Sequence, residues 1–149
     1  MAALIISFRL DNKYLISLLI SFLVLFSNDL AGQPSGMKWS DEGNSYYTLN
    51  NNQIIKYSLP GNLPATLISE AQLTPEKSTV PLAVSYFSIN EKTGKALLMT
   101  KSKKVWRLNT RGDFWIFDLN TGKLSQLGKN LPPSSLMFTK ISPDGKYAA

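Results

Sequence analysis

The chain of 149 residues contains no cysteine and no histidine. Without cysteine it can form neither a disulfide framework nor a thiolate metal site. Without histidine it lacks the imidazole that moves the proton in Ser-His-Asp and Cys-His catalytic units, and it lacks the commonest ligand of zinc and copper. The sequence therefore predicts no catalytic residue, no metal site and no cofactor within these residues.

Positive charge exceeds negative charge, with a formal net charge of +6. Most lysines occur in predicted turns and beside predicted strands, where they keep a sheet protein soluble. One local cluster comprises Lys101, Lys103, Lys104, Arg107 and Arg111. It is either a solvated or substrate-facing patch or a nucleic-acid site. Because no recognisable nucleic-acid-binding module accompanies it, we predict no nucleic-acid partner.

A long apolar run, YLISLLISFLVLF, occupies residues 14–26. Arg9 and Lys13 precede it and the stretch Leu30-Ala31-Gly32 follows, an order that indicates a secretory signal peptide. Helical residues over this run would rise only about 20 Å, less than the roughly 30 Å hydrocarbon core of a membrane. We expect residues 1–32 to be a signal peptide or, alternatively, a membrane anchor through residues 14–26; a buried core helix is the third interpretation. Either of the first two places residues 33–149 in the periplasm or cell envelope.

Beyond Gln33 the apolar residues no longer follow a helical period. Short runs rich in β-branched and aromatic residues are bounded by Gly, Pro, Asn or Asp, which predicts an all-β domain over residues 33–149. The predicted strands are Tyr46–Leu49, Ile54–Leu59, Ala83–Ile89, Ala96–Thr100, Val105–Leu108, Phe114–Leu119 and Leu136–Ile141.

A turn motif recurs three times, each time as an apolar residue, a serine, a turn that ends in glycine and a new strand. The serines are Ser40, Ser88 and Ser142, and the turn glycines at 43, 94 and 145 are spaced by 51 residues each time. Repeats of about 40 to 50 residues with about four strands each are typical of β-propeller blades. We therefore predict an incomplete β-propeller of about two four-stranded antiparallel blades; a β-sandwich with coincidental spacing is the alternative.

The second repeat carries an insertion over residues 101–112 that contains Trp106 and Arg107. An extended hairpin of this kind either reaches toward a ligand or belongs only to the blade. In the first case Arg107 offers a fixed fork of donors to a carboxylate or a carbonyl oxygen. In the second case Trp106 caps the blade, and Arg107 either snorkels to the solvent or pairs with Asp113. The residues alone leave both interpretations open.

Residues 104–107 (KVWR), followed at a fixed interval by residues 114–119 (FWIFDL), resemble the N-terminal propeller of the dipeptidyl peptidase IV family of serine peptidases. The turn at residues 141–146 and the stretches 37–47 and 87–97 are similar to the blade-opening turns of that family. The resemblance implies an eight-bladed propeller over an α/β-hydrolase domain that removes dipeptides after Pro or Ala from peptide N-termini. It implies that Arg107 binds the substrate's backbone carbonyl, and it assigns no chemical role to Trp106.

The same resemblance implies that the paired glutamates, the Gly-x-Ser-x-Gly nucleophile, the acid and the histidine of the family would follow Ala149. The function expected is that of an N-terminal propeller fragment of an exported serine dipeptidyl peptidase, which gates and positions the peptide substrate. The alternatives are a non-catalytic envelope propeller that binds a partner or a glycan, and a remnant that never folds. A homodimer of the full-length protein stays open.

Overall fold

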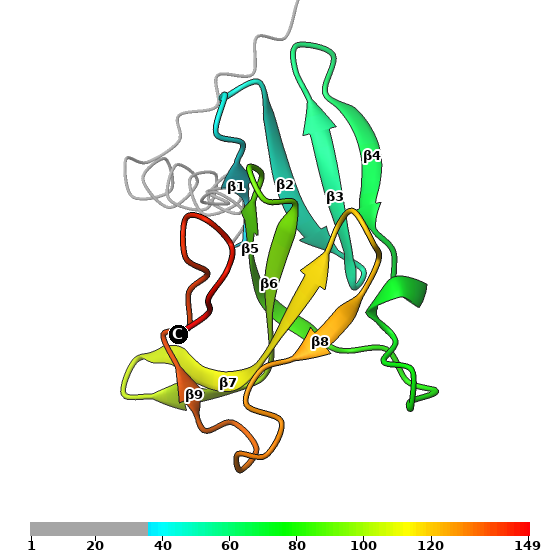
Figure 1. Cartoon of the computed structure of the whole chain (residues 1–149). Coiled ribbons are helices and arrows are strands. Elements are labelled where there is room, and N and C mark those ends of the chain that lie inside the picture. The colour runs from blue at the N-terminus through cyan, green and yellow to red at the C-terminus, as the bar shows by residue number, and fades with distance from the viewer. Residues whose placement is uncertain (1–35) are drawn as a thin grey trace, which may run out of the picture. The chain divides into compact units, whose positions relative to one another are not determined.

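The computed structural model describes residues 36–149, which form nine β-strands and one short 3-10 helix in two antiparallel sheets (Figure 1). The predicted signal peptide or anchor of residues 1–32 lies outside the described residues. Within residues 36–149 no helix is long and apolar enough to cross a membrane. The prediction of an all-β class is confirmed for this part of the chain.

The first sheet contains four strands in chain order, β1 (Lys38–Trp39), β2 (Ser45–Asn50), β3 (Gln53–Ser58) and β4 (Leu63–Ile68). The hairpin between β2 and β3 closes through Asn51 and Asn52, whose φ angles are 46° and 58°. Asparagine tolerates this left-handed conformation, which two-residue hairpin turns require. The 3-10 helix η2 (Ala71–Leu73) lies on the connection to the second sheet.

The second sheet has the strands β5 (Val84–Asn90), β6 (Lys95–Val105), β7 (Leu108–Asp118) and β8 (Leu124–Gln126) in chain order. A fifth strand, β9 (Leu136–Met137), pairs with β7 at Arg111 and Gly112. Two antiparallel sheets of mainly four sequential strands agree with the predicted strand content of about two blades.

Two strand predictions are wrong. The segment Val105–Leu108 is the turn of the hairpin between β6 and β7, because the pairing of these strands continues up to Val105 and Leu108. The segment Leu136–Ile141 is a strand only over Leu136–Met137, because Phe138 adopts a φ of 57° that breaks the extended backbone.

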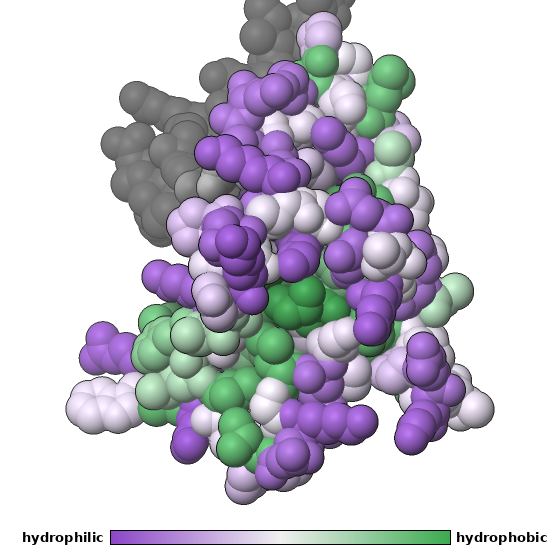
Figure 2. Space-filling model, viewed as in Figure 1, coloured by the Kyte–Doolittle hydropathy of each residue, from purple (hydrophilic) through white to green (hydrophobic). Residues whose placement is uncertain are grey.

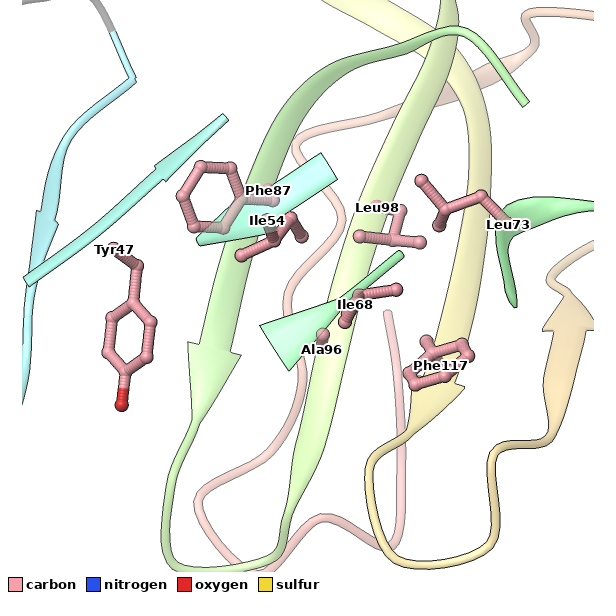
Figure 3. Close-up of a cluster of buried hydrophobic side chains, with 8 residues drawn as sticks. All are labelled: Tyr47, Ile54, Ile68, Leu73, Phe87, Ala96, Leu98 and Phe117. Atoms are coloured by element: carbon pink, nitrogen blue, oxygen red, sulfur yellow. The ribbon is translucent and has the colours of Figure 1, made fainter. Parts of the chain in front are cut away.

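A buried apolar layer joins the two sheets (Figure 3). Phe117 and Leu98 from the second sheet lie with Ile68 and Ile54 from the first sheet in one buried cluster, and all four are less than 2% exposed. The other members of this cluster are Tyr47, Leu73, Phe87 and Ala96. Burying such a layer is the main favourable term in folding.

The second sheet is also buried on its other face. Leu97, Met99 and Phe114 form a second cluster there, with Ile141 from the C-terminal segment packed against it. Residues 96–99 consequently read as a continuous apolar run, since alternate side chains enter the two clusters. Figure 2 shows apolar side chains gathered over the region of β6, β7 and β9, bordered by hydrophilic ones.

The repeated turns have the conformation that their glycines predict. Gly43, Gly94 and Gly145 have φ angles of 71°, 63° and 68°, and each donates its N–H to the carbonyl three residues earlier. The Oγ atom of Ser40 accepts the N–H of Ser45 at 3.1 Å, and that of Ser142 accepts the N–H of Tyr147 at 3.0 Å.

The serine of the second repeat does not have this role. Ser88 lies within β5, and the residue three positions before Gly94 is Glu91. The side chain of Asn90 takes over part of the turn, because its Oδ1 atom accepts the N–H of Thr93 at 3.2 Å. The predicted equivalence of Ser88 with the other two serines is therefore wrong.

Successive turns contact one another at the spacing of the repeat. The Glu91 carboxylate accepts the Tyr47 hydroxyl at 2.8 Å and the Asp41 N–H at 3.4 Å, both from the first repeat. The Lys95 ammonium donates to the Gly145 carbonyl at 2.7 Å in the third turn. Burial, together with the hydrogen bond to Glu91, raises the pKa of Tyr47 well above its ordinary value. These bonds give the regular spacing of the turns a structural reason.

The contact between Tyr47 and Glu91 yields a stability prediction. Tyr47→Phe retains the buried ring but leaves the Glu91 carboxylate without its hydroxyl donor. We expect the free energy of unfolding of the chain to fall by about 1–3 kcal/mol, the range for a hydrogen bond to a charged group. Denaturant unfolding measures the change. Tyr57→Phe is the control, because within residues 36–149 no hydrogen bond of the Tyr57 hydroxyl is found; equal losses in both variants would contradict this role of Glu91.

A second prediction concerns acid stability. Hydrogen bonds from the backbone N–H groups of Thr121 and Asn120 hold the pKa of Asp118 below its ordinary value, and the Ser142 hydroxyl does the same for Asp144. A folded-state pKa below the unfolded value means that these carboxylates stabilise the fold above about pH 4 and lose that effect as the pH falls through the folded value. In Asp118→Asn/Asp144→Asn, unfolding followed between about pH 5 and pH 2 should depend less on pH than in the parent. An unchanged slope would exclude both groups, and Glu76→Gln serves as an exposed control.

Candidate functional site

The hairpin between β6 and β7 extends beyond the sheet, and we call its residues 101–112 the arm. In Figure 1 it is the yellow-green hairpin at the lower left, beside β9. Below the arm, Thr100 pairs with Asp113; within it, Lys103 pairs with Arg111 and Val105 with Leu108. A bulge between Thr100 and Lys103 separates the two parts. The predicted insertion at residues 101–112 is therefore a long extension of one hairpin.

Trp106 and Arg107 form the two-residue turn at the tip of the arm. Trp106 is 94% exposed and has a φ of 61°, a conformation that glycine usually supplies in such turns. Arg107 is exposed as well, and within residues 36–149 its guanidinium makes no hydrogen bond or ion pair. The tip thus holds an aromatic ring and a free cation away from the sheet.

This geometry decides against one interpretation of the insertion. Trp106 does not cap the sheet, because almost all of its surface is exposed. Asp113 does not pair with Arg107; its Oδ2 atom lies 3.2 Å from the ammonium of Lys101. These contacts disagree with a capping Trp106 and with an ion pair between Arg107 and Asp113.

The arm carries positive charge without compensation of its own. Residues 101–112 contain no Asp or Glu, and Lys103, Lys104, Arg107 and Arg111 are all exposed. Lys103 and Arg111 are cross-strand partners, an arrangement of like charges that destabilises a hairpin. The arm can therefore offer donors to carbonyl or carboxylate oxygens.

A cavity of about 590 Å³ lies beside the root of the arm. Its polar wall includes Ser88 and Asn90 of β5 and Asn109 and Thr110 of the arm, while Met99, Phe114 and Ile141 contribute apolar surface. Arg107 is not among the lining residues. No pattern in the sequence indicates this cavity, because residues 138–141 and 143 line it together with residues that are distant in the chain.

Residues 36–149 contain no group of three acidic side chains that could hold a metal ion. A Ser-His-Asp unit is likewise excluded by the lack of histidine.

Comparison with protein families gives one match, between residues 90–149 and the dipeptidyl peptidase IV (DPP IV) N-terminal region. Residues 90–149 are therefore similar to that family region. The resemblance predicted from the sequence is thereby confirmed, and Trp106, Arg107 and the following strand all lie within the matched residues.

Comparison with solved structures gives a match of the fold. The crystal structure of Porphyromonas gingivalis dipeptidyl peptidase 4 matches with a TM-score of 0.66 and 19% sequence identity over 95% of this chain. At this identity the likeness is one of fold, and this chain spans only 19% of the length of that protein. A search of curated proteins finds no significant sequence match.

The root of the arm yields a prediction about Gly112. A Cβ atom at this position would lie 2.7 Å from the backbone oxygen of Thr100 and 2.8 Å from Cγ of Met99. Because a backbone oxygen cannot rotate away, we expect Gly112→Ala to lower the free energy of unfolding by about 1–3 kcal/mol, as in other overpacked sites. Denaturant unfolding measures this change in the free energy of unfolding. Gly61→Ala is the matched control, because its nearest contact is 3.4 Å to a Leu63 side chain; equal effects would mean that the close packing at Gly112 has no influence.

Proposed function

We propose that this chain is the opening part of the propeller of an exported serine dipeptidyl peptidase, and that Arg107 places the peptide substrate. The observation that carries the proposal is an exposed arginine, unpaired within residues 36–149, at the tip of a long hairpin inside the segment that matches the family. A guanidinium presents several donors in a rigid fork, which suits a peptide carbonyl oxygen.

The proposal that the two sheets are propeller blades is supported by three features. Each sheet contains four strands in sequential order, with β9 added to the second sheet; the sheets pack through a shared apolar layer, and the turns contact each other at the repeat spacing. Radial repetition of four-stranded sheets produces all three features. Burial of the second sheet on both faces also fits a blade with a neighbour on either side.

Within the proposed enzyme, the role of Arg107 is to orient the substrate. A charged donor that holds a substrate carbonyl brings the scissile bond near a nucleophile on another domain, which removes part of the entropic barrier. The nucleophile, its acid and its histidine, and the glutamates that hold the substrate's amine, would come from elsewhere in the protein. Export is proposed from the sequence of residues 1–32, and cleavage after Pro or Ala from the family resemblance.

The alternative of a non-catalytic propeller that binds a glycan has weaker support. Trp39, Tyr46 and Tyr57 form an aromatic row on the first sheet. The rings of Tyr46 and Tyr57 stack with their centroids 5.0 Å apart and an interplanar angle of 9°, so each ring covers one face of the other. A sugar would need such faces free. In contrast, the Arg107 guanidinium on the arm is exposed and has no hydrogen-bond or ion-pair partner within residues 36–149.

The proposed role of Arg107 is tested in the protein that carries this chain together with its hydrolase domain. Arg107→Ala should lower kcat/KM for a dipeptide substrate ending in Pro or Ala by about 30- to 160-fold, which corresponds to the loss of a charge-assisted hydrogen bond of about 2–3 kcal/mol. Arg107→Lys should fall in between, because it retains the charge and loses the fork. Arg111→Ala removes the same charge from the same arm and is the control. An unchanged kcat/KM in Arg107→Ala would overturn the assignment.

A further inference from the structure

Three residues connect the base of the arm to the rest of the fold. The Asp113 carboxylate lies 3.2 Å from the Lys101 ammonium through Oδ2, and its Oδ1 atom accepts the backbone N–H of Ser134 at 2.6 Å. The Ser134 hydroxyl donates to the carbonyl of Lys101 at 2.9 Å. Each residue thus contacts the other two, although Ser134 lies 33 residues from Lys101 in the chain.

These contacts lie at the points where both strands leave the sheet. Lys101 directly follows Thr100 and Asp113 directly follows Gly112, so the ion pair spans the two strands at the bulge. Ser134 comes from the segment that continues into β9, which itself pairs with Arg111 and Gly112. The arm is therefore fixed on both strands at its base.

The burial of Asp113 and the backbone conformations of Lys101 and Ser134 are each locally unfavourable in free energy, so the contacts of these residues must hold them in place. The Asp113 side chain is only 9% exposed, so its charge needs the partners that it has. Lys101 and Ser134 have φ angles of 45° and 57°, left-handed conformations that are unfavourable for residues other than glycine. Such conformations persist only where surrounding contacts hold them.

We propose that Lys101, Asp113 and Ser134 are positioning residues that fix the direction of the arm and, through it, the place of Arg107. We call the three residues the clamp. The contact between Arg107 and a substrate rests on the function proposed above. The ordering of the arm by the clamp does not depend on that function.

The length of the arm makes its base important. Arg107 lies six positions after Lys101, a reach of roughly 20 Å in extended conformation. A rotation of about 10° at the base would move the tip by roughly 3 Å, more than a hydrogen bond to a substrate can tolerate. A two-stranded ribbon is only marginally stable by itself, so the orientation of the arm must come from its base.

The first test measures amide hydrogen exchange in the full chain. Asp113→Asn changes the charge with little change in shape, and Lys101→Met keeps the stem of a largely exposed side chain, so both should fold. We expect the amides of residues 103–109 to exchange about tenfold faster or more in both variants, while those of residues 95–99 and 114–118 stay as in the parent. Lys101→Arg, which retains the ion pair, and Lys104→Met, an exposed arm residue outside the clamp that pairs with the uncharged Asn109, should both behave as the parent.

Unchanged exchange in the arm would overturn the proposal. Equal acceleration in the arm and in the sheet would also overturn it, because that result describes a general loss of stability without a positioning role.

The second test is a double-mutant cycle in the protein that carries this chain and its hydrolase domain. If the clamp acts through Arg107, Asp113→Asn raises KM and lowers kcat/KM about tenfold in the parent, and has no further effect in Arg107→Ala. An equal loss in both backgrounds would overturn the connection to Arg107. If Asp113→Asn loosens the arm in the exchange measurement while Arg107→Ala leaves kcat/KM unchanged, the clamp stands and the proposed function of Arg107 fails.

Discussion

Ile54 and Ile68 of the first sheet pack against Phe87, Leu98 and Phe117 of the second, and the rest of the structure depends on this buried contact. Joining the two sheets also brings the turns of successive repeats within hydrogen-bonding distance, so that Glu91 reaches Tyr47 and Lys95 reaches Gly145. The spacing of 51 residues in the sequence thus corresponds to one sheet and one step from turn to turn.

The arm is held in place by interactions other than those of the buried layer. It contributes nothing to the buried layer, its tip is exposed, and its cross-strand pair of Lys103 and Arg111 opposes its formation. What holds it is the polar network at its base, where a buried carboxylate, an ammonium and a backbone N–H meet. The core therefore provides stability and the polar base provides direction. This division of labour is what one expects where a rigid scaffold carries a ligand-binding loop.

Much of the fold follows from local patterns in the sequence. The turn glycines, the Asn51-Asn52 hairpin and the apolar runs each indicate their structure through local backbone preferences, and the greater length of the second repeat correctly predicts an extended hairpin. The strand assignment failed at Val105–Leu108, because β-branched and aromatic residues suit a strand and a left-handed Trp106 cannot be anticipated from composition. Similarly, Ser88 imitates the serines of the other turns although Glu91 occupies the equivalent position.

Local patterns in the sequence predicted only part of the candidate site. Arg107 was found through the insertion and the family resemblance, both of which are visible in a single stretch of sequence. The pairing of Asp113 with Lys101 and Ser134 was not, because it depends on the register at a bulge and on a segment that returns from residue 134. The cavity beside the arm has the same origin, since residues 138–143 approach β5 only in the folded chain.

The central claim is that a rigid arm carries the Arg107 guanidinium to the substrate of a peptidase. The most direct measurement is a crystal structure of the protein that carries this chain, with its hydrolase domain and a bound substrate-like peptide. The account predicts a distance of about 2.7–3.2 Å between a guanidinium nitrogen of Arg107 and a backbone carbonyl oxygen of the peptide. A peptide bound in the catalytic cavity with Arg107 out of contact would contradict it.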